Sequence, residues 1–258
     1  MRGAASILIL ASLWPAAALA GLTETQVGQV TLSPPPAARV PTALVFKDLN
    51  GRDVTLGNAI AGRPTLLLPA DFTCTQICGP ALSIAAGALS QTGLQAGRDY
   101  SLVVIGIDAN DSVEDARRFT SGQVGGPGVS VLSGSDETID SLMAAIGYRF
   151  QRDSANDAIA HPAAYVTLAA DGRVSRVLSS LALQPTDLRL ALLEAGDGRI
   201  GGIAGRIALL CYGFDAVHGI YTRQIATLLQ IGGGLTVAIL ASALGLMLWR
   251  TARRGASA

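Results

Sequence analysis

Two cysteines, Cys74 and Cys78, are the side chains of this sequence best suited to thiol or metal chemistry. They stand four residues apart, after the apolar run Thr65–Leu68 and at the start of a helical pattern near Ala81. Residues i and i+4 share one face of a helix, so both sulfurs can turn toward one point. Because the chain has only three cysteines and two of them lie in this loop, we expect the loop to be the functional site of the protein.

The residues alone leave three fates open for this pair. One is a structural disulfide, the default for close cysteines in an oxidising compartment. A second is a dithiol redox centre, in which the helix N-terminus would stabilise a thiolate, although oxidoreductases usually place two residues between the cysteines and this loop has three. The third is a soft-metal site, since two thiolates favour Cu(I) or Zn over hard cations.

Few other side chains could complete a metal site. The chain has two histidines, His161 and His218, and three methionines, of which one is the initiator and Met247 lies in the apolar C-terminal segment. Methionine-rich copper binding is therefore excluded by count. His161 precedes an apolar strand pattern, and α/β folds gather their sites at strand ends, so it is the candidate third ligand, with a plain turn residue as the alternative. Cys211 and His218 lie next to the apolar C-terminal segment.

Strand and helix patterns alternate through the middle of the chain. Asn50-Gly51 and Asp171-Gly172 predict a hairpin at each end of this series. Asp111 followed by Glu114 predicts a capped helix start. The order predicts an α/β fold with helices on both faces of one mixed sheet. Strands are expected near 43–46, 54–56, 65–68, 101–108, 129–132, 163–168 and 174–178, and helices near 80–94, 112–120, 135–146 and 185–195.

The two ends of the chain predict export and a membrane anchor. Residues 1–20 begin with the basic Arg2, continue with an apolar run and end in small residues, which is the pattern of a cleaved signal peptide. Residues 226–249 contain no Asp, Glu, Lys, Arg or His and are long enough to form a transmembrane helix. The arginines that follow, Arg250, Arg253 and Arg254, predict a cytoplasmic tail at 250–258. This topology places a single-pass protein in the inner membrane with its folded domain in the periplasm.

Between these ends we expect three parts. They are an extended Pro-rich leader at 21–40, one domain at 41–197 and a juxtamembrane segment at 198–225. The chain has 19 acidic and 19 basic residues, which gives a formal net charge of zero. Without a basic excess to neutralise phosphates, nucleic acid is not an expected partner.

The order of these features resembles the Sco/SenC family, in its bacterial branch with a C-terminal membrane anchor. The resemblance covers the chain from about Val40 to Trp249 and rests first on the cysteine loop with the distant His161. The shorter motifs that carry it are Ile107-Asp108, Ala164-Tyr165-Val166, Asp171-Gly172-Arg173, Asp187–Leu192 and Leu209–Tyr212.

The resemblance implies a thioredoxin-like copper-binding fold that helps to assemble the CuA centre of cytochrome c oxidase. By position, Cys74 and Cys78 would be thiolate ligands and His161 the imidazole ligand of one copper ion, as Cu(I) and also as Cu(II). The implied partners are the oxidase subunit that carries the CuA site and other periplasmic copper or thiol-redox proteins.

No substrate bond needs to break in such a role, so a chaperone is expected rather than an enzyme. The alternatives are a thiol–disulfide oxidoreductase that reduces the cysteines of its partner, and an interaction domain with a structural disulfide.

Overall fold

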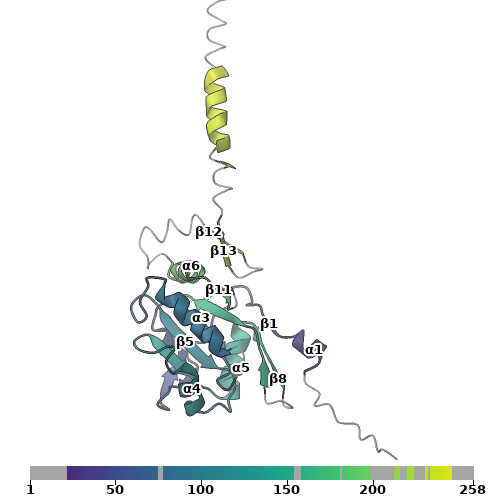
Figure 1. Cartoon of the computed structure of the whole chain (residues 1–258), viewed down its shortest axis with the longest axis vertical. Helices are drawn as coiled ribbons and strands as arrows, with labels where there is room; N and C mark the ends of the chain where they lie inside the picture. Colours follow the sequence, from purple (N-terminus) through teal and green to yellow (C-terminus); the bar gives the residue numbers. More distant parts are fainter. Residues whose placement is uncertain are drawn as a thin grey trace, which may run out of the picture.

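A five-stranded mixed sheet in the order β11-β10-β4-β5-β6 forms the centre of the molecule (Figure 1). The computed structural model describes residues 22–74, 78–153, 158–180, 182–197, 212–215, 220–223, 230–231 and 233–245. Strands β4, β5 and β6 are parallel, whereas β10 is antiparallel to both of its neighbours. The strands are β4 (Thr65–Ala70), β5 (Ser101–Gly106), β6 (Val129–Leu132), β10 (Ala164–Leu168) and β11 (Val174–Ser179).

Helices cover both faces of this sheet, as the sequence predicts (Figure 1). All residues of β4 and β5 are buried, because a central strand with a helical layer on each side meets apolar side chains in both directions. Leu66 and Leu68 pack on one face, while Leu67 packs on the other. The first face is covered by α3 (Cys78–Ser90), α4 (Val113–Thr120) and α6 (Pro185–Ala195), and the second by α2 (Leu56–Ile60) and α5 (Asp136–Ala145).

Both predicted hairpins are present. Strands β2 (Val45–Lys47) and β3 (Asp53–Thr55) pair around Gly51, and β10 and β11 pair around Gly172. Each glycine has a positive φ, +74° for Gly51 and +84° for Gly172, a conformation that other residues adopt only at a cost.

The predicted cap of α4 is wrong by one residue. Ser112 and Asp115 form the capping box, with the Asp115 N–H donating to Ser112 Oγ at 3.1 Å and the Ser112 N–H donating to Asp115 Oδ2 at 2.9 Å. Asp111 instead turns inward, and its Oδ2 accepts the backbone N–H of Phe72 at 2.9 Å. The physical reason is a buried donor from a distant segment, which the spacing of Asp111 and Glu114 does not reveal.

The segment expected to be an unpacked leader takes part in the fold. It contains α1 (Glu24–Val27) and β1 (Thr31–Leu32), and β1 pairs antiparallel with β7 (Tyr148–Arg149). Val40 is buried, and its N–H donates to the carbonyl of Gly172 at 2.9 Å. The leader packs because Val40 and Leu32 join the apolar core on the face covered by α2 and α5. A further pair, β8 (Gln151–Asp153) with β9 (Ala158–Ala160), was not expected from the sequence.

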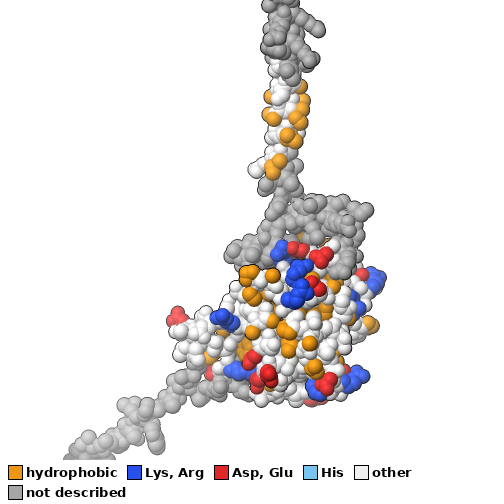
Figure 2. Space-filling model, turned by 180° about the vertical axis from the view of Figure 1, so that it is seen from behind, with side chains coloured by type: hydrophobic (Ala, Val, Ile, Leu, Met, Phe, Trp, Pro, Cys, Tyr) orange, Lys and Arg blue, Asp and Glu red, His pale blue; other side chains and the backbone are white. Residues whose placement is uncertain are grey.

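The C-terminal part contains a hairpin and a helical stretch. Strands β12 (Tyr212–Asp215) and β13 (Ile220–Arg223) pair antiparallel. Residues 230–231 and 233–245 are helical, and apolar side chains of this stretch are exposed (Figure 2). Within the described ranges, no helix is both long enough and apolar enough to cross a membrane. The predicted signal peptide at 1–20, the tail at 250–258 and both ends of the predicted span at 226–249 lie outside the described residues.

Gly106, the last residue of β5, leaves room for the aromatic ring that precedes the cysteine loop. A Cβ atom at this position would lie 2.8 Å from Cε2 of Phe72, which is closer than van der Waals contact allows. The Phe72 ring is buried and stands 5.4 Å from the ring of Phe119, centroid to centroid. The close approach therefore fixes the backbone two residues before Cys74.

Substitution Gly106→Ala is expected to destabilise the protein by about 1 to 3 kcal/mol, because the added methyl group overpacks the Phe72 ring. The urea midpoint of the full chain in detergent measures this. Gly87→Ala in α3 is the matched control, since a Cβ there would meet no atom within 4 Å, and a helical alanine should stabilise by up to about 1 kcal/mol. Equal midpoints for the two variants would show that the Phe72 contact is not tight.

Burial of Asp111 predicts a pH-dependent stability. Burial raises the pKa of this carboxyl from 3.8 to about 6, and the negative charges of Asp71 and Asp108 add to the rise, while the Phe72 N–H opposes it. A raised pKa means that the folded state binds more protons than the unfolded state between about pH 4 and pH 6. Stability should therefore fall as the pH rises through this window.

Asp111→Asn should remove this loss, because the amide oxygen can still accept the Phe72 N–H without carrying charge. A shift of about two pKa units corresponds to about 3 kcal/mol, so the variant should exceed the parent by an amount of that order above pH 6 and match it near pH 4. Urea midpoints across this range test the difference. The exposed Asp140→Asn serves as control, and a gap between Asp111→Asn and the parent that does not change with pH would contradict the assignment.

Candidate thiol and metal site

The antiparallel pairing of β4 with β10 brings Cys78 and His161 together. In this register Val166 faces Leu67 and Leu168 faces Thr65, so the chain before β10 runs past the end of β4. His161 lies just before β10, and Cys78 is the first residue of α3, which follows β4. The Sγ atom of Cys78 lies 3.0 Å from Nε2 of His161.

Cys74 joins this pair from the loop that follows β4. Its side chain is half-buried, whereas Cys78 is buried, and the two thiols are hydrogen-bonded to each other. Neither cysteine is in a disulfide. Cys74, Cys78 and His161, the three side chains predicted for the site, therefore lie at one end of the sheet. Cys74 is the more accessible of the two cysteines.

Asp71 shapes the start of the cysteine loop. Its Oδ1 accepts the backbone N–H of Thr73 at 3.0 Å and that of Cys74 at 3.1 Å, and it also accepts the Thr73 hydroxyl at 2.9 Å. A short acidic side chain that binds the backbone two and three residues ahead forms a tight turn. Asp71 is not among the residues predicted for the site, although Asp71-Phe72-Thr73-Cys74 carries this turn signal in the sequence.

Tyr148 holds the other side of the His161 ring. Its hydroxyl oxygen lies 2.8 Å from Nδ1 of His161 and donates to the carbonyl of Pro162 at 3.0 Å. The ring of Tyr148 is buried and stacks with that of His161, with centroids 6.4 Å apart. Sequence reasoning missed this residue, because a lone tyrosine after a helix carries no motif.

Burial favours the uncharged forms of both Cys78 and His161. Burial raises the pKa of the Cys78 thiol well above its ordinary value, and the hydrogen bond with Cys74 adds to the rise. Burial also lowers the pKa of His161, although the Pro162 carbonyl and the charge of Asp71 oppose this. A dithiol redox centre would need the helix N-terminus to stabilise a thiolate, whereas the pKa of Cys78 moves in the opposite direction. Cys78 is thus a neutral thiol beside a neutral imidazole.

The donor types fit a soft metal ion, since two sulfurs and one imidazole nitrogen are the ligands that Cu(I) and Zn prefer. Their present arrangement does not enclose an ion: in the described part of the chain, no three His, Cys, Asp or Glu side chains already form a group that could hold a metal. Binding would replace the thiol protons by the ion, which is the usual course for cysteine ligands. Cys211 and His218 lie outside the described residues.

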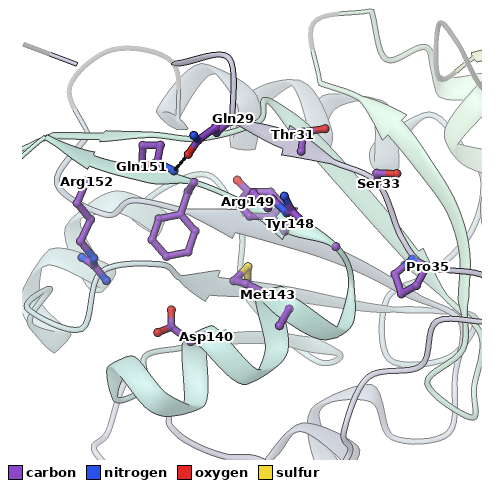
Figure 3. A pocket seen from close by; sticks show the side chains of 13 residues that line it. Gln29, Thr31, Ser33, Pro35, Asp140, Met143, Tyr148, Arg149, Gln151 and Arg152 are labelled. Atoms are coloured by element: carbon purple, nitrogen blue, oxygen red, sulfur yellow. Dashed lines mark hydrogen bonds between the residues drawn. The ribbon is translucent and has the colours of Figure 1, made fainter. Parts of the chain in front are cut away.

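Two cavities adjoin these side chains. A small one of about 10 Å³ lies behind Cys78 and His161, and its other walls are apolar, so it is at the lower limit for a water molecule. A groove of about 940 Å³ opens on the other side of Tyr148, between β1, α5 and β8 (Figure 3). Tyr148 lines this groove, whereas the two cysteines and His161 do not. The larger groove is therefore a neighbour of the thiol site and not part of it.

The fold, though not the sequence, is shared with known proteins. No protein-family model matches the sequence, and no curated protein is similar to it. A candidate electron transfer protein from Aquifex aeolicus VF5 has 22% identity and a TM-score of 0.57, over 64% of this chain and 96% of its own.

Two further structures belong to Sco proteins. BsSco, a member of the Sco family of cytochrome c oxidase assembly proteins, has 18% identity and a TM-score of 0.52, over 64% of this chain and 96% of its own. A SCO1/SenC family lipoprotein from Bacillus anthracis str. Ames has 17% identity and a TM-score of 0.51, over 60% of this chain and 92% of its own. At these identities the similarity concerns architecture, and the chain has the fold of the Sco structures.

Proposed function

We propose that this chain is a membrane-anchored copper chaperone that acts outside the cytoplasm and assists assembly of the CuA centre of cytochrome c oxidase. The observation that carries the proposal is the 3.0 Å contact between Cys78 Sγ and His161 Nε2, which joins residues 83 positions apart. The fold shared with BsSco, a member of a family of cytochrome c oxidase assembly proteins, supports the choice of partner.

In this proposal one Cu(I) ion binds to the sulfurs of Cys74 and Cys78 and to Nε2 of His161. Three soft donors suit Cu(I), and Cu(II) is the second valence that this set could hold. Cys78 and His161 form the fixed side of the site, because Cys78 contacts His161 and His161 is also held by the Tyr148 hydroxyl. The half-buried Cys74 would close the site around the ion and release its thiol proton.

Transfer would proceed by ligand exchange, in which the cysteines of the acceptor replace those of this chain one at a time. The accessible Cys74 is the ligand that an incoming thiol can displace first. The exposed apolar helix over 233–245 supports an anchor that keeps both proteins at one membrane, with the domain in the periplasm and the C-terminus in the cytoplasm. The oxidase subunit that carries the CuA site is the proposed acceptor.

A thiol–disulfide oxidoreductase is the second candidate. It is favoured by the two thiols, which are not joined in a disulfide, are hydrogen-bonded to each other and could form a disulfide while two electrons and two protons reduce a disulfide of the partner. BsSco, of the same fold, is a protein in which a disulfide switch has been identified. The raised pKa of Cys78 weighs against this residue as the attacking thiol, because the thiolate is the nucleophile in exchange, and leaves that role to Cys74.

Replacing each proposed ligand should sharply weaken copper binding. We expect the reduced full chain in detergent to bind one Cu(I), measured by competition with bicinchoninate. Cys74→Ala, Cys78→Ala and His161→Ala should each lower the affinity by roughly 100-fold or more, since even the loss of a residue that only supports a ligand costs 10- to 100-fold. Cys211→Ala and His218→Ala are the matched controls and should keep the affinity of the parent. Equal affinity in His161→Ala and the parent would rule out the three-ligand site.

A different experiment separates the two candidates. Because His161 contacts Cys78 Sγ, His161→Ala would alter thiol reactivity as well as copper binding and cannot discriminate between them. The copper-free reduced chain should instead be mixed with an oxidised CuA domain, and the copper-loaded chain with a reduced one. Copper transfer without disulfide reduction supports the chaperone, whereas disulfide reduction without copper transfer supports the oxidoreductase.

A further inference from the structure

We propose that Tyr148 is a positioning residue that fixes the tautomer of His161, so that Nδ1 carries the proton and the lone pair of Nε2 points toward Cys78. Three distances carry the inference. The Tyr148 hydroxyl oxygen is 2.8 Å from Nδ1 and 3.0 Å from the Pro162 carbonyl oxygen, and Nδ1 itself is 3.2 Å from that carbonyl. The consequence for copper rests on the proposed function, whereas the tautomer does not.

The hydrogens can be counted in this triangle. A neutral imidazole has one N–H, a tyrosine hydroxyl has one hydrogen, and a carbonyl has none. If Nδ1 is protonated, it donates to the hydroxyl oxygen, the hydroxyl donates to Pro162, and the Cys78 thiol donates to Nε2. Each short contact in this arrangement contains a hydrogen, and the 3.2 Å approach of Nδ1 to the carbonyl is also favourable.

The opposite tautomer does not fit the same distances. With the proton on Nε2, the Tyr148 hydroxyl can donate its one hydrogen to Nδ1 or to the Pro162 carbonyl, and not to both. If it goes to Nδ1, both Nδ1 and the hydroxyl oxygen face the carbonyl oxygen of Pro162 with no hydrogen between them. If it goes to Pro162, the 2.8 Å contact between the hydroxyl oxygen and Nδ1 has no hydrogen between two lone pairs. The geometry therefore selects the proton on Nδ1.

The fold fixes Tyr148 firmly enough for this role. Its side chain is only 2% exposed, so water cannot readily replace its hydroxyl. It belongs to β7, where it faces Leu32 of β1, and it stands in the wall of the groove shown in Figure 3. Gly147 packs so closely on the backbone of Ser33 that a Cβ would lie 2.0 Å from its carbonyl oxygen. A hydrogen bond to the distal nitrogen of a ligating histidine orients the ring and raises its basicity.

The test is Tyr148→Phe in the reduced full chain, with ¹⁵N-labelled histidine and long-range proton–nitrogen correlation spectra. The chain has two histidines, so His218 serves as an internal reference. We expect the Nδ1–H tautomer for His161 in the parent and a mixture of tautomers in the variant. Cu(I) affinity, measured by competition with bicinchoninate, should fall by about 10-fold or more.

Tyr165→Phe is the matched control. Its hydroxyl is also buried and donates to the carbonyl of Ala81 at 2.6 Å, so its loss removes a buried hydrogen bond at another point, in β10 of the central sheet. This variant should keep both the tautomer of His161 and the Cu(I) affinity. A similar effect in both variants would mean that any lost tyrosine hydroxyl disturbs the site and would overturn the specific role of Tyr148.

Two further results would overturn the proposal. An Nε2–H tautomer in the parent would do so without any variant, even if Tyr148→Phe failed to fold. Unchanged tautomer and affinity in a folded Tyr148→Phe would do the same. A parent that binds no Cu(I) would overturn the proposed function alone, because the tautomer is read from the copper-free protein.

Discussion

The pairing of β4 with β10 is the constraint on which the candidate site depends. Because the two strands are antiparallel, the end of β4 lies beside the start of β10, and the residues that follow one strand meet those that precede the other. In a parallel pair, His161 would lie at the opposite end of the sheet, roughly 16 Å away for a five-residue strand at about 3.3 Å per residue. The contact between Cys78 and His161 is thus a product of topology, made from residues that the chain keeps far apart.

Burial then decides the chemistry at this contact. A helix N-terminus favours a thiolate, yet the pKa of Cys78 is raised, because the buried sulfur is desolvated and hydrogen-bonded to Cys74. The pKa of His161 is lowered for the same reason. A neutral thiol hydrogen-bonded to a neutral imidazole is a stable arrangement in the absence of metal. The neutral thiol is also a weak nucleophile. A soft cation can replace the thiol proton, because its positive charge compensates the negative charge of the thiolate, which would otherwise be buried without a partner.

The sequence predicts those features that depend on local pattern. The uninterrupted apolar runs of β4 and β5, the two glycine turns and the cysteine spacing are local, and the structure agrees with the strand and hairpin predictions. The sequence does not reveal features that depend on a partner far along the chain. Asp111 does not cap the helix as expected, because it accepts the backbone N–H of Phe72, 39 residues away. Tyr148 acquires its role only through contact with His161, which no spacing rule connects to it.

The N-terminal segment has a larger part in the site than its composition suggests. Tyr148 is held in place by β7, and β7 pairs with β1 at residues 31–32, which lie before the expected domain start at 41. Gly147, the residue before it, fits against Ser33 with no space for a side chain, and Ser33 N–H donates to the Gly147 carbonyl at 2.9 Å. A domain cut at residue 41 would lose β1 and the support of Tyr148, and with it the orientation of His161. The functional unit must therefore begin before Thr31, because the segment that looks like a linker supports the residue that orients the candidate ligand.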